Sequence, residues 1–291
     1  MAMSRLDIVN KKIAEGIIPR VAAVHDICGY GNCSLAVALP VVSAAGVDTL
    51  PVPTSVVSAQ TNIEHYTIYD TTETLDAYID SWKKIGFDLD GIYTGFLGSV
   101  EQIDLIKKLH NNYEDAFTVI DPVMGDHGKR YATYTDEMCT AMRELVPLAD
   151  ILMPNLTEAS ILLDRDYPGV NIDLDEAKEI AQALIDMGAK NVVLKGIEKD
   201  DCIANLILSE TGETSLVKHK LHPIKLHGTG DLFASSVVAG IFSGHSLEES
   251  VDFAAKFVYE AIEVSTKQEG YLERGVNFES ILDRVTDFCL K

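Results

Sequence analysis

The residues best suited to chemistry lie in a glycine-rich stretch near the carboxyl end, His227-Gly228-Thr229-Gly230-Asp231, before a run of small and apolar residues. Glycines let the backbone turn tightly and bring several N–H groups to one point, and a helix beginning there adds partial positive charge. Such an anion hole suits a transferring phosphoryl group, and Asp231 is placed to accept a hydroxyl proton. We expect the helix dipole to keep Asp231 ionised, as a weak base that mainly positions the hydroxyl. A turn with a helix cap is the alternative interpretation.

Polar residues also follow three apolar runs elsewhere in the chain. Asp121, if buried at a strand end, needs a metal ion or a cationic side chain, and Lys195 at another strand end could reach a nucleotide phosphate. Asn155 could orient phosphate or metal, and Glu158 could help to hold Mg²⁺. Each residue has a simpler alternative: a turn for Asp121, a surface position for Lys195, and a capping box for the other two.

The segment after the first apolar strand combines a glycine-containing turn with the start of a helix. Residues 26–32 read Asp-Ile-Cys-Gly-Tyr-Gly-Asn, which is not the GxGxxG fingerprint, and no Walker A motif occurs in the chain. A Rossmann dehydrogenase and a P-loop NTPase are therefore both disfavoured. We interpret His25 as a core histidine, and Cys28 as a packing residue rather than a contact for an aldehyde substrate.

These residues must be positioned by the elements between them, which alternate between short apolar runs and longer amphipathic segments. The alternation predicts an α/β fold with a mostly parallel sheet, helices on both faces, and a single domain over residues 1–291. Parallel sheets bind ligands at the carboxyl ends of their strands. The loops expected there are 25–32, 54–62, 94–98, 121–130, 154–158, 195–197 and 226–231. Residues 54–70 break the alternation and are predicted to form a small lid with short strands.

The composition excludes several classes of partner. The chain carries 24 Lys and Arg against 45 Asp and Glu, a net charge of −21, which repels nucleic acid and anionic lipid. No apolar run approaches the roughly 20 residues that cross a bilayer, so we expect a soluble, cytoplasmic protein. The five cysteines show no spacing typical of a zinc site or a disulfide framework. A nucleotide would need local cations, namely Mg²⁺, backbone N–H groups and a few lysines.

The motifs and their order resemble the ribokinase-like superfamily, and most closely its pyridoxal/pyridoxamine kinase branch. The stretches that carry the resemblance are IDPVMGD at 120–126, VPLADILMPNLTEASIL at 146–162 and HGTGDLFAS at 227–235. The resemblance implies a three-layer α/β/α sandwich that transfers the ATP γ-phosphoryl group to the 5′-hydroxymethyl group of a vitamin B6 vitamer. It also implies a requirement for Mg²⁺, frequent activation by K⁺, and a homodimer.

The resemblance also assigns roles to the residues of the phosphate motifs. Asp231 matches the catalytic Asp of the family, and the turn Gly228-Thr229-Gly230 matches its anion hole. The positions implied for the nucleotide are Asp121, Asn155, Glu158, Lys195 and Thr229, and those implied for the metal are Asp121 and Glu158.

The substrate side departs from the pattern of pyridoxal kinases. Asp26 stands where those enzymes carry Ser, residues 57–61 read VSAQT in place of FSNHT, and Phe96 replaces a Tyr. We expect Asp26, Ser58, Thr61 and Phe96 to line the acceptor pocket beside the catalytic carboxylate, and Asp26 to favour a cationic group such as the amine of pyridoxamine. The alternatives are a kinase for hydroxymethylpyrimidine or another small hydroxymethyl heterocycle, and a non-catalytic nucleotide- or vitamin-binding protein.

Overall fold

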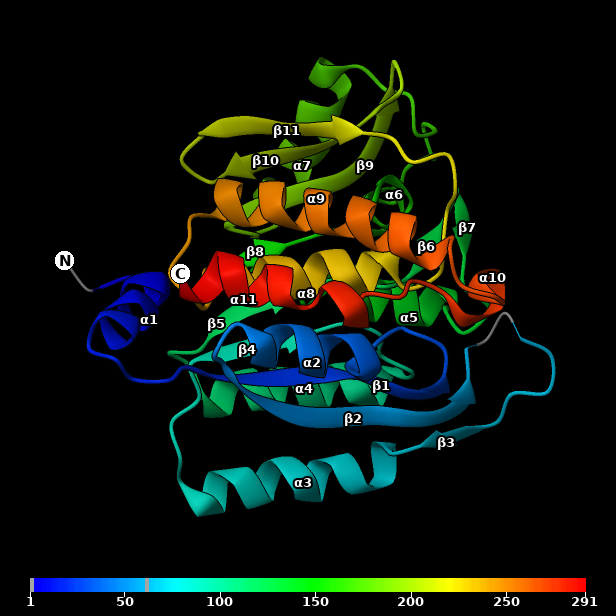
Figure 1. Cartoon of the computed structure of the whole chain (residues 1–291). Helices are drawn as coiled ribbons and strands as arrows, with labels where there is room; N and C mark the ends of the chain where they lie inside the picture. The colour runs from blue at the N-terminus through cyan, green and yellow to red at the C-terminus, as the bar shows by residue number, and fades with distance from the viewer. Residues whose placement is uncertain (1–2, 61–62) are drawn as a thin grey trace.

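The computed structural model describes residues 3–60 and 63–291, which fold into three layers (Figure 1). A nine-stranded sheet with the order β11-β10-β9-β8-β5-β4-β1-β2-β3 forms the middle layer. The strands from β9 to β2 in this order run parallel, whereas β3, β10 and β11 are antiparallel to their neighbours. The expected α/β/α sandwich with a mostly parallel sheet is therefore confirmed.

The strands at the centre of the sheet are short and apolar, as the sequence pattern predicts. The parallel strands are β1 (Arg20–Tyr30), β2 (Asp48–Ala59), β4 (Gly91–Thr94), β5 (Phe117–Ile120), β8 (Ile151–Leu152) and β9 (Asn191–Lys199). The others are β3 (Ile68–Asp70), β10 (Cys202–Ser209) and β11 (Thr214–Lys220), with a separate pair, β6 (Gly125–Asp126) and β7 (Lys129–Arg130). All residues of β4 and β5 are buried, which is typical of parallel strands covered on both faces.

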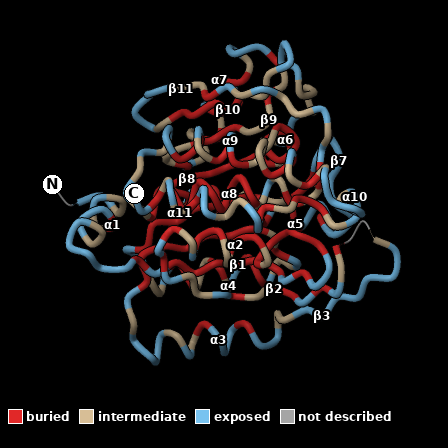
Figure 2. The backbone as a smooth tube through the Cα atoms, viewed as in Figure 1, coloured by how far each residue is buried: buried red, intermediate tan, exposed pale blue. Residues whose placement is uncertain are grey.

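Helices cover both faces of the sheet, and each face has its own apolar core. The first face packs against α3 (Thr72–Ile85), α4 (Val100–Asn112), α5 (Asp136–Arg143), α6 (Leu156–Leu163) and α7 (Leu174–Asp186). The second packs against α1 (Arg5–Ala14), α2 (Leu35–Ala44), α8 (Thr229–Ile241), α9 (Leu247–Ser265) and α11 (Asp283–Leu290). Alternate residues of β1 enter the two cores, Ala22 and Val24 on the first face, Val21 and Ala23 on the second. Figure 2 shows this buried interior and an exposed rim.

Helix α8, which follows the glycine-rich motif, is enclosed on all sides after its first turn. Every residue from Leu232 to Ile241 is buried, and α8 packs against α2 and α9. Its many small residues permit this close packing, and the Ser235 hydroxyl shares a hydrogen bond of 3.2 Å with the Tyr93 hydroxyl of β4. The amino end of α8 is therefore held rigidly against the sheet.

The segments at 25–32 and 54–62 differ from the predicted loops. β1 continues to Tyr30 and β2 to Ala59, and the two strands stay paired along this extension. β3 then pairs with Ser55, Val56 and Val57 of β2, so the described part of the predicted lid is largely an extension of the main sheet. The sequence predicted short strands within 54–70 but not the extension of β1 and β2, because glycines and polar residues at an exposed sheet margin give no hydrophobic alternation.

Two further elements were not predicted from the sequence. Helix α1 buries only Val9 among its ten residues, and the pair β6–β7 is too short to give a periodic pattern. Near the carboxyl end, a 3-10 turn at Glu279–Ile281 comes directly before α11. Among the described helices, none has the length and apolar character needed to cross a membrane.

The close contact between β4 and α8 gives a prediction about stability. A Cβ atom on Gly91 would lie 2.2 Å from the ring of Phe242, which is itself buried. We expect Gly91→Ala to lower the free energy of unfolding by about 1–3 kcal/mol through overpacking, as measured by urea denaturation. Gly98→Ala is the control, because its Cβ would find only ordinary contacts, 3.6 Å or more away. Equal stability of the two variants would contradict the packing argument.

Candidate active site

The polar residues selected from the sequence gather at one edge of the sheet. Asp121 directly follows β5, Asn155 follows β8, and Lys195 lies within β9, three parallel strands whose carboxyl ends point the same way. Figure 1 shows the amino end of α8 and the β6–β7 hairpin on this same side of the molecule. These residues therefore gather at the edge that the strand-end rule for parallel sheets indicates.

A buried ion pair joins two of these strand ends. The Lys195 Nζ donates to Asp121 Oδ1 at 2.7 Å, and the two side chains are 12% and 3% exposed. Burial alone would lower the pKa of Lys195, but the charges of Asp121 and Glu158 raise it above its ordinary value. Lys195 lies at a bulge in β9, which changes the direction of its side chain. At this bulge Gly196 has a φ of 77° and donates its N–H to Asn205 Oδ1.

Asn155 and Glu158 form a complete capping box at the start of α6. The Asn155 N–H donates to Glu158 Oε2 at 2.7 Å, and the Glu158 N–H donates to Asn155 Oδ1 at 2.9 Å. The Asn155 side-chain amide also donates to the Gly125 carbonyl at 2.9 Å. The capping box that the sequence analysis gave as the alternative is therefore present. The Asn155 side chain also connects the loop after β5 to α6. Any direct contact of Asn155 with phosphate stays a prediction.

Asp121 and Glu158 have the chemistry of a site for a hard cation. Both carboxyl groups are buried, and Lys195 supplies only one positive charge for the two. Burial, together with the charge of Asp121, raises the pKa of Glu158 to about 8, so an added cation would stabilise its ionised form. The described residues contain no group of three or more His, Cys, Asp and Glu able to hold a metal. Phosphate and water oxygens would have to complete the coordination of Mg²⁺.

Asp231 lies in the first turn of α8, after Gly228 as the N-cap residue. Burial raises the pKa of Asp231 to about 7, and a hydrogen bond from the Ser34 backbone offsets only part of this effect. We expected the helix amino end to keep Asp231 a weak base, and this expectation was wrong because the loss of hydration outweighs the dipole. A carboxylate of this pKa accepts protons effectively near neutral pH. Thr229 uses its hydroxyl to donate to the Leu226 carbonyl at 3.0 Å.

Ser34 is a site residue that the sequence analysis missed. It is 7% exposed, has a φ of 54°, and comes directly before α2. Its backbone approaches Asp231, and its side chain hydrogen-bonds Asp26. A non-glycine residue held at positive φ marks backbone that the surrounding structure constrains, often at functional sites. No sequence signal indicated it, because any residue type can be forced into this conformation by tertiary contacts.

The predicted substrate residues are only partly brought together. Asp26 is 8% exposed, and burial raises its pKa. Phe96 is half-buried and packs edge-on against Tyr134. Ser58 is exposed, and its hydroxyl accepts a hydrogen bond from the Thr67 N–H at 2.8 Å, so its place in the acceptor pocket stays a prediction. Thr61 lies outside the described residues.

The chain near the carboxyl end closes over the turn that follows β1. Asn32 donates its backbone N–H to the Arg274 carbonyl and its side-chain amide to the Val276 carbonyl at 2.8 Å. A Cβ on Gly228 would lie 1.8 Å from the Asn32 carbonyl oxygen, so only glycine fits where this turn meets the start of α8. Asn32 is a second residue that sequence reasoning missed, although a Gly-Asn step before a helix is a recognisable turn signal.

His25 matches the core interpretation in its burial, but not the expectation that a core histidine has hydrogen-bond partners. It is fully buried against Tyr93, with ring centroids 4.4 Å apart, and burial lowers its pKa to about 3. Both ring nitrogens lack a hydrogen-bond partner within the described chain. A histidine with this pKa stays neutral at physiological pH, so it cannot supply the positive charge that the acidic site lacks.

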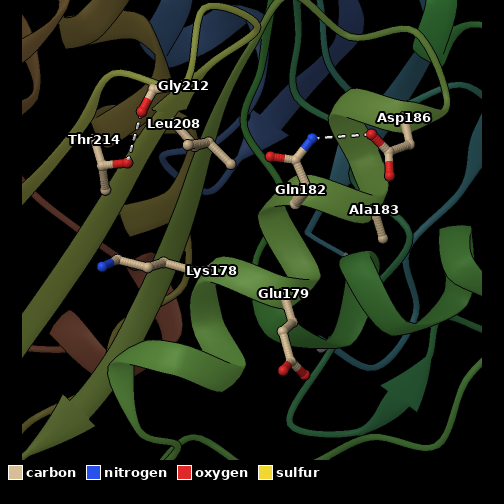
Figure 3. Close-up of a pocket in the computed structure, with 8 residues that line it drawn as sticks. All are labelled: Lys178, Glu179, Gln182, Ala183, Asp186, Leu208, Gly212 and Thr214. Carbon is tan, nitrogen blue, oxygen red and sulfur yellow. Dashed lines mark hydrogen bonds between the residues drawn. The ribbon is translucent and has the colours of Figure 1, made fainter.

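A depression lies away from these residues, between α7 and the β10–β11 hairpin (Figure 3). Its volume is about 500 Å³, and Gln182 and Asp186 on its wall hydrogen-bond to each other at 2.9 Å. Leu208 on its floor pairs with Val192 near the amino end of β9, so this depression lies at the opposite end of the sheet. It contains none of the site residues described above.

The Asp121–Lys195 pair gives a prediction that separates electrostatics from packing. We expect Lys195→Met to lower the free energy of unfolding by about 3 kcal/mol at neutral pH, because Asp121 is left as an unpaired buried charge. The loss should shrink at lower pH, because burial raises the pKa of Asp121 and the protonated carboxyl carries no charge.

Urea denaturation of the double variant Lys195→Met, Asp121→Asn should recover part of this loss. Lys190→Met is the matched control, because its partner Asp150 keeps a second ion pair with Arg5 at 3.0 Å. A loss in the control equal to that of Lys195→Met would show that a buried unpaired charge is not the cause.

Comparison with known proteins identifies the family. The family model for phosphomethylpyrimidine kinase matches residues 37–275. The chain is 30% identical over 258 residues to the pyridoxine/pyridoxal/pyridoxamine kinase of Bordetella avium, covering 83% of this chain and 84% of the relative. It is 30% identical over 198 residues to the hydroxymethylpyrimidine/phosphomethylpyrimidine kinase of Bacillus subtilis, covering 66% and 70% of the two chains.

Solved structures agree with this assignment. A Bacteroides thetaiotaomicron protein described as a phosphomethylpyrimidine kinase and crystallised with pyridoxal superposes with a TM-score of 0.87 at 31% identity, covering 92% of this chain and 96% of its own. The pyridoxal kinase of Lactobacillus plantarum superposes with a TM-score of 0.86 at 27% identity, covering 92% and 97%. The relatives divide between vitamin B6 kinases and hydroxymethylpyrimidine kinases, so they leave the acceptor unresolved. The prediction of a phosphotransferase is confirmed, and the chain belongs to the phosphomethylpyrimidine kinase family of ribokinase-like enzymes, which phosphorylate hydroxymethyl groups.

Proposed function

We propose that the protein transfers the γ-phosphoryl group of ATP to the 5′-hydroxymethyl group of a vitamin B6 vitamer: pyridoxal, pyridoxamine or pyridoxine. The observation that carries the proposal is Asp231, a carboxylate with a pKa of about 7 at the amino end of α8, close to the buried Asp26. A base tuned to neutral pH beside a helix amino end suits transfer of a phosphoryl group to an alcohol. The Bordetella avium relative is a kinase of these vitamers by name, which supports the acceptor class.

In the proposed reaction, the turn before α8 receives the transferring phosphoryl group. A Cβ on Gly230 would meet no atom within 4 Å, so the space beside this turn is open. The first N–H groups of a helix have no partner within the helix, so in this proposal those at the start of α8 face that space and favour the developing negative charge. Because the Thr229 hydroxyl is already bonded to Leu226, the contribution of Thr229 would come from its backbone N–H. Asp231 accepts the proton of the attacking hydroxyl.

The acidic side chains at the strand ends would hold the nucleotide through a cation. Asp121 and Glu158 are the residues that would hold Mg²⁺, which when bound neutralises charge on the phosphates. Lys195 is near enough to Asp121 to place its ammonium beside the same phosphates. A second function of this buried lysine is to keep Asp121 in place when no nucleotide is bound.

Asp26 is the proposed determinant of the acceptor. Its carboxyl group is buried, and its charge contributes to the raised pKa of Asp231, so the two carboxylates interact electrostatically. A positively charged amine on the acceptor would stabilise the ionised form of Asp26, so pyridoxamine is the preferred vitamer in this proposal. Hydroxymethylpyrimidine is the second candidate, because the family model and the Bacillus subtilis relative carry that activity in their names.

The first test is turnover with and without the proposed base. We expect Asp231→Asn to reduce kcat by about 10²–10⁴-fold with little change in nucleotide affinity, because the variant cannot accept the hydroxyl proton. ADP release would be measured with Mg-ATP and four acceptors: pyridoxal, pyridoxamine, pyridoxine and hydroxymethylpyrimidine. The wild-type rate should fall as the pH drops below about 7, because Asp231 then becomes protonated. Asp186→Asn, in the remote depression, is the control. Near-normal turnover of Asp231→Asn would remove it from this role.

The second test concerns the choice among acceptors. We expect Asp26→Ser to lower the ratio of kcat/KM for pyridoxamine to that for pyridoxal by roughly tenfold, the scale of one charge-assisted hydrogen bond. Asp26→Asn should give a similar ratio while preserving side-chain shape. An unchanged ratio would show that Asp26 does not recognise the amine of pyridoxamine. Turnover on hydroxymethylpyrimidine alone would favour the second candidate function.

A further inference from the structure

Two cysteines, Cys28 and Cys33, meet beside the candidate site. The chain reverses direction after β1, and Ile27 forms an antiparallel bridge with Ser34. This register places the next residues inward, Cys28 and Cys33, opposite each other across the turn. Both are only 5% exposed, and both carry free thiols. The sequence spacing of four intervening residues did not reveal the pair, because it depends on how the turn folds.

The two thiols interact directly and differ in acidity. Hydrogen bonding to Cys33 is the largest effect that lowers the pKa of Cys28, and the same interaction raises the pKa of Cys33. The Cys28 thiol also donates to the Tyr30 carbonyl at 3.5 Å. Arg274, stacked 5.3 Å from the Tyr30 ring, further favours the Cys28 thiolate. Cys28 is therefore the more nucleophilic member of the pair, because the thiolate is the reactive form.

We propose that Cys28 and Cys33 are an oxidative modification site, which peroxide converts to an intramolecular disulfide that lowers kinase turnover. Residues paired across antiparallel backbone have Cα atoms about 4.5–5.5 Å apart, within the range of about 4.4–6.8 Å that disulfides require. Hydrogen peroxide is the proposed oxidant, because it is small enough to reach thiols that are almost fully buried.

The chemistry proceeds in two steps that consume one peroxide. The Cys28 sulfur attacks a peroxide oxygen, the O–O bond breaks, and a sulfenic acid and one water form. The Cys33 sulfur then attacks the Cys28 sulfur, the S–O bond breaks, and a second water leaves with the Cys33 proton. Two thiols are thereby oxidised by two electrons, and the peroxide is reduced to two waters.

The position of Cys33 explains why a disulfide would affect turnover. Ser34, which contacts both Asp26 and Asp231, is its immediate neighbour and is already held at a φ of 54°. On the other side of Cys33, the Asn32 carbonyl packs against Gly228 of the glycine-rich turn. A disulfide brings the two sulfurs to about 2.05 Å, and the backbone around Cys33 must adjust. Displacement of a site residue by about 1 Å is enough to lower a rate by up to about 100-fold.

Peptide mapping tests the site itself, independently of which acceptor the enzyme uses. The whole protein is treated with hydrogen peroxide, quenched with catalase, alkylated and digested. We expect a disulfide-linked product joining Cys28 and Cys33, two mass units lighter than the reduced form, that disappears after dithiothreitol. Cys33→Ser should give no such product, whereas Cys202→Ser, a half-buried cysteine on β10, should behave as the wild type.

Turnover, measured on whichever of the four acceptors is used, tests the coupling. We expect peroxide to lower the wild-type rate by roughly tenfold or more, with recovery on adding dithiothreitol. The Cys202→Ser control should respond in the same way, and each variant is compared with its own untreated rate. The proposal is overturned if both thiols remain alkylatable after peroxide, or if the linked protein retains its full rate. It is also overturned if Cys33→Ser loses and regains activity as the wild type does.

Discussion

The distribution of charge around Lys195, whose side chain is 12% exposed, is the constraint on which the site depends. Its ammonium pairs with Asp121 at 2.7 Å, and Glu158 interacts with it electrostatically when ionised. A buried ion pair of this kind adds little net stability, but removing one partner is costly, so the strand ends that carry it are held in a fixed arrangement. Asn155 extends that arrangement through the Gly125 carbonyl to the loop after β5. The nucleotide side of the site is thus organised by charge compensation rather than by apolar packing.

An acidic protein that handles a polyanion must keep some of its carboxyl groups from repelling the nucleotide. Burial does so by raising the pKa values of Glu158 and Asp231 to about 8 and about 7. Glu158 can then ionise when a cation arrives, and the ionised form of Asp231 can accept a transferable proton. The same balance decides between competing effects at Asp231, where loss of hydration exceeds the stabilisation given by the helix amino end. The net charge of −21 is therefore no obstacle to phosphate chemistry at this edge.

The proposed acceptor side is built differently, from backbone rather than from charge. The extended pairing of β1 with β2 and the reversal at residues 31–34 bring Asp26, Ser34 and Asp231 to one place. Gly228 fits against Asn32 with no room for a side chain, so the turn and the start of α8 are matched to each other. A change in this turn would consequently reach the acceptor residue and the proposed base together.

The sequence by itself determined the sheet, the helix layers, and the edge at which the site lies. Apolar strands alternating with amphipathic helices leave few topologies, and polar residues at strand ends of a parallel sheet must meet at one edge. The glycine-rich motif before α8 and the capping box of α6 could also be predicted from the sequence, because both are local patterns of backbone chemistry. Only the tertiary structure decided the base strength of Asp231, the exposure of Ser58, the strand extension at 54–59, and the roles of Ser34 and the Cys28–Cys33 pair. These depend on burial and on contacts between distant segments, which no local pattern of residues encodes.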